Sequence, residues 1–383
     1  MSIEDINSPI KFINPPIELK EKEGKRKTSG KNILLLLTAI FIFFLILEIS
    51  LRLFSYPVYG FQKGTFVSDE ILGYKLSPNY SGLQSIYERT VKINTNSKGM
   101  RDFREYDYNN TKGIPRILIL GDSYSFGNGV NLNESYAEYL RKEFGSNAEI
   151  INLAVPGYSI NHEYLSFLEE GKKYNPDIIL VAFSPNDWGI HQLVTEGSKI
   201  TVDKTKSAVA NKDGFLVQYE GGSIVRNIHL FLLWNCRAYG FLYTKSRAIF
   251  SKIVSNYWKK QEGTPLYFSD INSEQYKEAY AGYSSLIEKM KNSTNATIIL
   301  FAGPFSIYYV PPESVKKEYN IDYELNPAET KESVKKIAND LHISFIDVDI
   351  SEMDIYLPVD GHLNSEGNKL VADKLYSELS RFL

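Results

Sequence analysis

Four short polar segments of this chain contain the residue types that serine-based acyl chemistry requires. They are Gly121-Asp122-Ser123, Asn152-Leu153-Ala154-Val155-Pro156-Gly157-Tyr158-Ser159, Ser184-Pro185-Asn186-Asp187 and Asp360-Gly361-His362-Leu363-Asn364. Such a reaction needs a hydroxyl nucleophile, a histidine that takes its proton, and a carboxylate that orients the imidazole. It also needs hydrogen-bond donors where negative charge develops on the substrate oxygen. The sequence offers Ser123, His362 and Asp360 for the first three roles. The backbone N–H groups of Ser123 and Gly157 and the amide of Asn186 are the candidate oxyanion donors.

Other interpretations of the Ser123 segment fit less well. An α/β-hydrolase nucleophile elbow requires Gly-x-Ser-x-Gly, but Ser125 occupies the second glycine position. A phosphate-binding loop would need Gly-Lys-Ser/Thr, and Gly127-Asn128-Gly129 lacks the third glycine of a dinucleotide fingerprint. Each polar segment alone could also be an ordinary turn. It is their joint appearance, in this order, that indicates a catalytic site.

The elements that must position these segments follow a regular alternation. From Arg116 on, strand and helix patterns alternate, which indicates a parallel α/β domain. The predicted strands are Ile117–Leu120, Glu149–Leu153, Ile178–Phe183, Thr297–Phe301 and Ser344–Val348. The predicted helices lie around Ser135–Phe144, Asn161–Lys173, Ser273–Lys291, Lys331–Leu341 and Ser365–Phe382. Ligands collect at the carboxyl ends of the strands in such sheets, so the polar segments are expected to meet at one edge.

Taken together, the four segments resemble the ordered blocks of the SGNH, or GDSL-type, hydrolase superfamily, named for its Ser, Gly, Asn and His. The resemblance spans residues 114–383, and Asn96-Ser97-x-Gly99-Met100-Arg101 is similar to a stretch that precedes this domain in membrane-anchored members. It implies a three-layer, flavodoxin-like fold with a parallel sheet, and acyl-ester chemistry. It also implies the roles given above for Ser123, Gly157, Asn186 and His362.

Two blocks depart from the pattern of this superfamily. The third usually begins with glycine, whereas Ser184-Pro185 precedes Asn186 here. The last often has two residues between the aspartate and the histidine, whereas only Gly361 separates Asp360 from His362. Some relatives that handle acetyl groups on polysaccharides share this shorter spacing. Asp360 can reach His362 only if Gly361 bends the backbone, which glycine permits because it tolerates φ > 0; Asp354 is the alternative carboxylate.

The N-terminal part of the chain predicts a membrane anchor. Ile33–Leu47 is apolar apart from Thr38, and the apolar character continues to Phe54, which is long enough to cross a bilayer. No small-x-small cleavage site follows, which favours an uncleaved anchor over a signal peptide; a buried core helix is the other interpretation. Basic residues precede the span, which predicts a cytoplasmic N-terminus and an extracytoplasmic location for residues 55–383.

We therefore predict four regions. They are a cytoplasmic basic tail (1–32), a transmembrane anchor (33–54), an approach segment (55–112) and an SGNH hydrolase domain (113–383). In the approach segment, residues from Glu88 to Asn94 alternate as in a strand. In the hydrolase domain the strand–helix alternation stops within 188–270, where His229–Trp234 and Tyr239–Tyr257 predict a helical insertion. This insertion could be a lid, a surface resting on the membrane, or helices packed on their own domain.

The composition argues against several classes of partner and cofactor. A net charge of −3 argues against a nucleic-acid partner. Cys236 is the single cysteine, so the chain has neither an intramolecular disulfide nor a cysteine-based metal site. The five histidines show no ligand spacing, and we expect no metal and no cofactor.

Three hypotheses about function follow. The first is a membrane-tethered extracytoplasmic esterase or O-acyltransferase, with acetylated surface glycans as the expected substrate class and an acylated small molecule as the other. The second is a non-catalytic envelope protein that binds a glycan or a secretion partner on the same fold. The third is a lipase-like enzyme that uses the insertion as a lid. The pairing of Ser123 with His362 favours an enzyme.

Overall fold

The computed structural model describes residues 30–86, 89–188, 193–196, 199–202, 208–218, 224–246, 265–309, 311–350, 353–358 and 360–383. The chain divides into two compact units, Met1–Ile49 and Ser50–Leu383. Helix α1 (Gly30–Leu53) is long and apolar enough to cross a membrane, and the predicted span 33–54 coincides with it to within three residues at either end. The rest of the predicted basic tail, residues 1–29, lies outside the described residues.

A five-stranded parallel sheet lies at the centre of the second unit. Its strands run in the order β14 (Ser344–Asp347), β13 (Thr297–Ala302), β8 (Ile178–Phe183), β6 (Arg116–Leu120) and β7 (Glu149–Asn152). Counted along the chain from the other edge this is the order 2-1-3-4-5 of flavodoxin-like folds. All five predicted strands are confirmed, and none of their ends moves by more than one residue.

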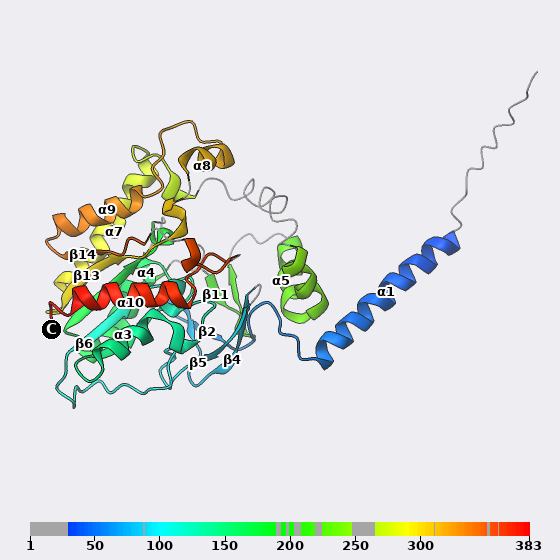
Figure 1. Ribbon diagram of the computed structural model, residues 1–383, viewed down its shortest axis with the longest axis horizontal. Coiled ribbons are helices and arrows are strands. Elements are labelled where there is room, and N and C mark those ends of the chain that lie inside the picture. Colours follow the sequence, from blue (N-terminus) through cyan, green and yellow to red (C-terminus); the bar gives the residue numbers. More distant parts are fainter. Residues whose placement is uncertain are drawn as a thin grey trace, which may run out of the picture. The chain divides into compact units, whose positions relative to one another are not determined.

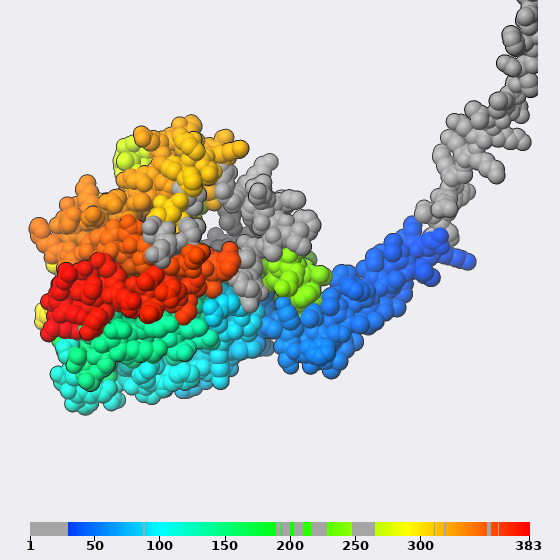
Figure 2. All heavy atoms as spheres, in the orientation of Figure 1, coloured from blue at the N-terminus to red at the C-terminus, as the bar shows by residue number. Residues whose placement is uncertain are grey.

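Helices cover both faces of this sheet (Figure 1). One face packs on α3 (Tyr136–Phe144) and α10 (Ser365–Leu379), which lie side by side in Figure 2, α10 in red and α3 in green. The other face packs on α4 (Ile160–Glu169), α7 (Glu274–Asn292) and α9 (Glu329–Asp340). Alternate strand residues enter opposite layers, because successive side chains point to opposite faces. Ile117 and Ile119 join the α3–α10 layer, whereas Leu118 and Leu120 join the other. The predicted three-layer architecture is confirmed.

Shorter helical elements connect these layers. The predicted helix Asn161–Lys173 divides into α4 and a 3-10 turn, η2 (Gly171–Tyr174). Helix α8 (Pro312–Tyr319) was not predicted. The other single turns are η1 (Leu132–Glu134), η3 (Pro185–Asp187), η4 (Leu266–Phe268), η5 (Ser306–Tyr309) and η6 (Met353–Ile355).

The approach segment is built of antiparallel strands. The strands β1 (Gly60–Phe61), β4 (Ser81–Ile86) and β5 (Arg89–Asn94) form one sheet. The strands β2 (Phe66–Asp69) and β3 (Gly73–Leu76) form a hairpin. The strand predicted at 88–94 is β5, and Glu88 itself lies outside the described residues.

The predicted insertion at 188–270 contains strands as well as the helices that the sequence predicted. Its described residues contain α5 (Ile224–Asn235) and helical residues 237–246, but also two hairpins. These are β9 (Leu193–Glu196) with β10 (Lys199–Val202), and β11 (Ala208–Ala210) with β12 (Leu216–Gln218). Strands of three or four residues are too short to show a period-two pattern, so the sequence did not reveal them. The part of Tyr239–Tyr257 beyond residue 246 lies outside the described residues.

The two hairpins pack on the approach segment. The backbone N–H of Gly64 donates to the carbonyl of Asp213 (2.9 Å), and that of Val202 donates to Ile71 (3.0 Å). The insertion and the approach segment therefore share hydrogen bonds, although 113–383 was predicted to be a domain of its own.

Candidate active site

Ser123 is the first residue of α2 (Ser123–Phe126), a one-turn helix that follows β6 directly. Asp122 caps this helix, since its Oδ1 accepts the backbone N–H of Tyr124 at 2.9 Å. The sequence predicted no helix between the strand Ile117–Leu120 and the helix around Ser135–Phe144, so α2 is an addition to that prediction. A single turn is too short to show helical periodicity. In the sheet, β6 lies between β7 and β8, so Ser123 is at the switch point where flavodoxin-like folds bind ligands.

Ser123, His362 and Asp360 form one hydrogen-bonded row. Ser123 Oγ lies 2.8 Å from His362 Nε2, and His362 Nδ1 hydrogen-bonds to Asp360 Oδ2. Gly361 has φ = +80°, which is the bend that the one-residue spacing requires. The carbonyl of Leu357 accepts the N–H of Gly361 (3.1 Å), and the N–H of Leu357 donates to the carbonyl of His362 (2.7 Å). The alternative carboxylate, Asp354, lies in η6 with an exposed side chain.

Tyr124 holds the histidine from the side. Its ring centroid lies 4.6 Å from that of His362 and 4.3 Å from that of Phe305. Its hydroxyl donates to the carbonyl of Gly361 at 3.1 Å. Burial, and secondarily the charge of Asp122, raise the pKa of Tyr124 above its ordinary value, so it remains a hydrogen-bond donor. The nucleophile helix is thereby tied to the loop that carries the base.

The candidate oxyanion residues lie on loops that are linked to α2. Asn186, in η3, is exposed, and its Nδ2 donates to the carbonyl of Tyr158 (3.2 Å), the residue after Gly157. Gly157 has φ = +82°, and a Cβ there would lie 2.8 Å from the Tyr74 hydroxyl. This position therefore requires glycine.

Ser184, which replaces the usual glycine, connects the third block to the first. Its hydroxyl lies 2.7 Å from Asp122 Oδ2 and 2.6 Å from Asn186 Oδ1, and its single proton can serve one of the two at a time. Burial raises the pKa of Asp122, while hydrogen bonds from Ser184 and from the Tyr124 backbone oppose this rise.

Arg101 of the approach segment holds the loop that follows α2. Its side chain is buried, and Nη1 donates to the carbonyls of Phe126 (2.8 Å) and Gly127 (2.6 Å), while Nη2 donates to Val130 (2.6 Å). Gly127 has φ = +80°, and a Cβ there would lie 3.1 Å from Arg101 Nη1. The stretch 96–101, to which the sequence assigned no physical role, thus supports the nucleophile helix.

Two further residues were missed by sequence reasoning. Asn128 Nδ2 lies 3.4 Å from His362 Nδ1, and its Oδ1 hydrogen-bonds to Gln84 Nε2. Gln84 Oε1 also accepts the backbone N–H of Gly129 (3.1 Å). A glutamine on an alternating strand and an asparagine between two glycines carry no sequence signal that separates them from surface residues.

Asp187, the residue after Asn186, and Glu163 of α4 are both buried acids. Burial raises the pKa of both Glu163 and Asp187 well above the usual carboxyl range. The charge of Asp122 adds to the rise in both, and the charge of Asp187 adds to the rise in Glu163. Asp187 Oδ2 accepts the backbone N–H of Ser184 (2.8 Å). Within the described part of the chain, neither carboxyl oxygen of Glu163 has a hydrogen-bond partner. Glu163 is therefore protonated over a wider pH range than an exposed glutamate.

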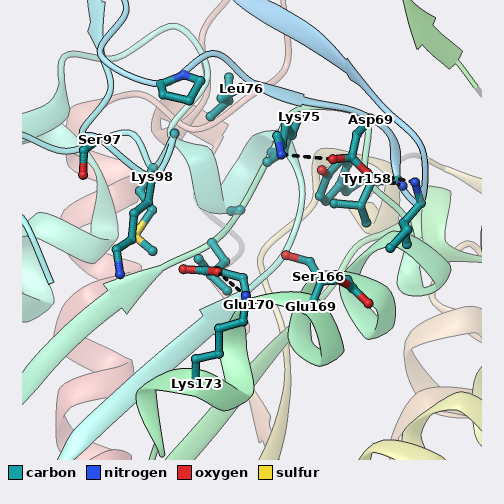
Figure 3. Close-up of a pocket in the computed structure, with 18 of the residues that line it drawn as sticks. Asp69, Lys75, Leu76, Ser97, Lys98, Tyr158, Ser166, Glu169, Glu170 and Lys173 are labelled. Carbon is teal, nitrogen blue, oxygen red and sulfur yellow. Dashed lines mark hydrogen bonds and ion pairs between the residues drawn. The ribbon is translucent and has the colours of Figure 1, made fainter. Parts of the chain in front are cut away.

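A cavity of about 340 Å³ lies between β2–β3, the 97–100 loop and α4, and neither Ser123 nor His362 lines it (Figure 3). Two ion pairs lie within its wall, Lys75 with Asp69 (3.0 Å) and Lys173 with Glu170 (3.1 Å). Lys98 lies over the Tyr108 ring, 3.3 Å from its centroid. Among the described residues, no group of three or more His, Cys, Asp or Glu side chains could hold a metal ion.

The order of the parallel sheet and the serine at its switch point are those of an SGNH-type α/β hydrolase. The chain belongs to the GDSL-like Lipase/Acylhydrolase family, whose sequence model matches residues 119–370. By family, the protein is an ester hydrolase. No curated protein matches the chain.

Solved structures with a similar chain path include several esterases. The acetyl xylan esterase AlAXEase has 16% identity and a TM-score of 0.38, over 69% of this chain and 99% of its own. A carbohydrate acetylesterase family member from Sinorhizobium meliloti has 14% identity and a TM-score of 0.37, over 70% and 99%. The psychrotrophic esterase EstA from Pseudoalteromonas sp. has 14% identity and a TM-score of 0.36, over 70% and 97%. At these low identities and scores, the substrates named for these proteins say nothing about this chain.

Proposed function

We propose that the protein is a membrane-anchored serine esterase or O-acyltransferase whose catalytic residues are Ser123, His362 and Asp360. The hydrogen-bonded row from Ser123 Oγ through the imidazole to Asp360 carries this proposal. Ser123 is half-exposed and lies at the switch point of the sheet, so an ester can reach its Oγ atom.

In the first half-reaction, Ser123 Oγ attacks the acyl carbon while His362 Nε2 takes the hydroxyl proton. Asp360 accepts the Nδ1–H, so the imidazole keeps the tautomer in which Nε2 is free to act as a base. The carbonyl oxygen becomes negative, and the N–H groups of Ser123 and Gly157 and the amide of Asn186 would donate to it. Loss of one such donor typically costs about 2.7–4 kcal/mol of the barrier.

The intermediate collapses when the bond to the leaving alcohol breaks and His362 gives that oxygen its proton. The acyl group remains on Ser123 Oγ. In the second half-reaction, His362 takes a proton from the incoming hydroxyl, which attacks the acyl carbon, and then returns the proton to Ser123 Oγ. Water as the incoming group gives a hydrolase, and a sugar hydroxyl gives an O-acyltransferase.

The proposed substrate class is an acetyl ester of a surface glycan. The short Asp360-Gly361-His362 spacing supports it, since it resembles that of relatives that handle acetyl groups on polysaccharides. An anchored domain also has its substrates beside it when they are attached to the cell envelope. The experiment compares the purified full-length protein on nitrophenyl acetate and a long-chain nitrophenyl ester, with and without an acetylated polysaccharide. Preference for the long chain would contradict the acetyl assignment, and no turnover above a Ser123→Ala control would favour a binding protein.

The proposed location rests on α1, which is apolar over a length that can cross a bilayer and follows a basic sequence. We infer that residues 1–32 are cytoplasmic, that 33–54 remain as an uncleaved anchor, and that the approach segment and hydrolase domain are extracytoplasmic. Protease added to intact spheroplasts should digest residues 55–383. Protection of this part, or its release into the soluble fraction, would contradict the orientation or the anchor.

A further inference from the structure

The insertion carries an apolar surface on its helices. Ile228 and Phe231 of α5 are 54% and 62% exposed, and Leu242, in helical residues 237–246, is 38% exposed. We call these three residues the apolar patch. Ile228 and Phe231 are three positions apart, so they lie on one face of α5. The opposite face is packed, since Leu233 is buried there. Trp234, three positions after Phe231, borders the apolar residues, and its ring stacks on Phe215 at 4.3 Å.

These helices pack on the residues that follow the anchor. Arg52 Nη2 donates to the carbonyl of Asn235 (2.9 Å), and Arg237 Nη1 donates to the carbonyls of Leu51 and Arg52 (both 3.2 Å). The rings of Tyr56 and Phe241 meet at 5.4 Å between centroids, and those of Tyr59 and Tyr243 at 5.6 Å. Residues 51–59 and both helices belong to the same compact unit.

The depth of residues 51–59 in a membrane follows from the length of the apolar run. If residues 33–54 cross the bilayer, the chain leaves the hydrocarbon near Phe54, so Tyr56 and Tyr59 lie at headgroup level, where tyrosine is favoured. Leu53 and Phe54 are 78% and 86% exposed, as residues facing lipid would be. A helix bonded to residues 51 and 52 must lie at the same level, within a side chain's length of the acyl boundary.

We propose that the apolar patch of α5 and residues 237–246 inserts into the outer interface of the membrane and forms a second membrane contact of the enzyme domain. This rests on the proposed anchoring by α1. The occupant of the patch is the lipid interface. An apolar helix face that lies parallel to the interface gains free energy from burial in the acyl boundary. Lys245, one turn from Leu242, is exposed and can meet lipid phosphates.

The consequence is a fixed orientation. One helix tethers a domain but lets it rotate and tilt, whereas a second contact beside the first restricts both motions. The ester bonds that Ser123 can reach would then lie at a set height above the membrane, which favours substrates attached to it over soluble ones.

The test uses the full-length protein reconstituted into phosphatidylcholine–phosphatidylglycerol vesicles. In a Cys236→Ser background, Phe231→Cys and Phe103→Cys are labelled with an environment-sensitive fluorophore. Phe103 is the matched control, because it is also an exposed phenylalanine (69%) but lies in the approach segment. Label at 231 should be quenched by lipids brominated near the headgroup, at least about twofold more than label at 103, because it lies within the acyl boundary. Aqueous iodide should show the reverse order.

Two failures can be told apart. If the protein floats with the vesicles but position 231 is quenched by iodide as strongly as position 103, the anchor stands and the patch inference is overturned. If the unlabelled protein does not float with vesicles at all, the anchor and the patch inference are both overturned. A Leu242→Cys variant repeats the measurement on the second helix, so one misfolded variant cannot decide the result. Ester turnover of each labelled protein verifies its fold.

Discussion

The parallel sheet and the antiparallel approach segment contribute to the same site in different ways. Ser123, at the start of α2, and Asp360 and His362, shortly before α10, are half-exposed, so that their atoms can meet a substrate. Arg101 and Gln84 come from the approach segment and are only 5% and 1% exposed. They touch the loop 126–130 rather than any space open to a substrate. The parallel sheet positions the reacting side chains, and the approach segment fixes the loop 126–130 that follows α2.

This comparison predicts that substitution of Ser123, Asp360 or His362 abolishes turnover. Substitution of approach-segment residues such as Arg101 should only lower it. The largest effect is expected for Ser123→Ala and His362→Ala. Each should lower kcat by about 10⁴- to 10⁶-fold, because the residues act as a unit. The measurement is nitrophenyl acetate turnover by the full-length variants, with thermal unfolding to show that the fold is kept. Near wild-type activity of the Ser123→Ala protein would show that Ser123 is not the nucleophile.

The next effect concerns the carboxylate that orients His362. Asp360→Asn should lower kcat by roughly 10⁴-fold, because an asparagine amide favours the wrong imidazole tautomer. Asp354→Asn is the matched control, since this aspartate belongs to the same loop but its side chain is exposed. We expect it to change kcat less than about twofold. If the two variants ranked in the opposite order, Asp354 would take the role.

Arg101→Lys tests the approach segment directly. A lysine ammonium cannot reach three carbonyls with the fixed geometry of a guanidinium, so the loop after α2 should loosen. We expect kcat to fall by about 10- to 100-fold, or about 1.4–2.8 kcal/mol, with little change in KM. Arg104→Lys is the matched control in the same segment, because Arg104 is half-exposed and pairs with the buried carboxylates of Asp102 and Glu138 rather than with the loop after α2. Equal losses in both variants would mean that Arg101 acts only through stability.

The smallest effect on activity is expected for Glu163→Gln, which instead changes the pH dependence of stability. The raised pKa of Glu163 means that the unfolded chain releases this proton at a lower pH than the folded protein. The free energy of unfolding should therefore fall as pH rises from the ordinary carboxyl range toward the raised pKa. Glu163→Gln removes one such group, while Asp187 keeps its own raised pKa.

The drop in Tm as pH rises above the ordinary carboxyl range should consequently be smaller in Glu163→Gln than in the wild type. Glu169→Gln, an exposed glutamate of the same helix, should leave the drop unchanged. An identical pH dependence in all three proteins would show that Glu163 ionises normally.

The sequence allowed the sheet and the polar loops to be predicted for a physical reason. Strands such as Ile178–Phe183 are buried on both faces and read as continuous apolar runs. The polar residues after them, such as Asp122 and Asn186, stand out against those runs. The Asp360–His362 contact also followed from local chemistry, because Gly361 is the residue that permits the bend.

The remaining features depend on contacts that no local pattern reports. Arg101 looks like any basic loop residue until the chain folds and places it under α2, and Gln84 looks like a polar residue on an exposed strand. The hairpins at 193–218 are short, and they are fixed by tertiary contacts, of β11 with β2 and β3 and of β10 with α4. The one-turn helix α2 is capped by Asp122, and the Asp122 side chain accepts a hydrogen bond from Ser184. Ser184 is 62 positions away from Asp122 in the sequence.

Ser123 and His362 are 239 positions apart in the sequence, so they are synthesised at different times. A ribosome adds about 5–20 residues per second, so the nucleophile precedes its base by roughly 12–48 s. Helix α10, which must dock on α3 beside Tyr136, is made later still. A nascent chain therefore carries an unactivated serine, and its apolar N-terminal helix emerges long before any ester can be cleaved. If the site acts as proposed, delivery to the membrane comes first and enzymatic competence last.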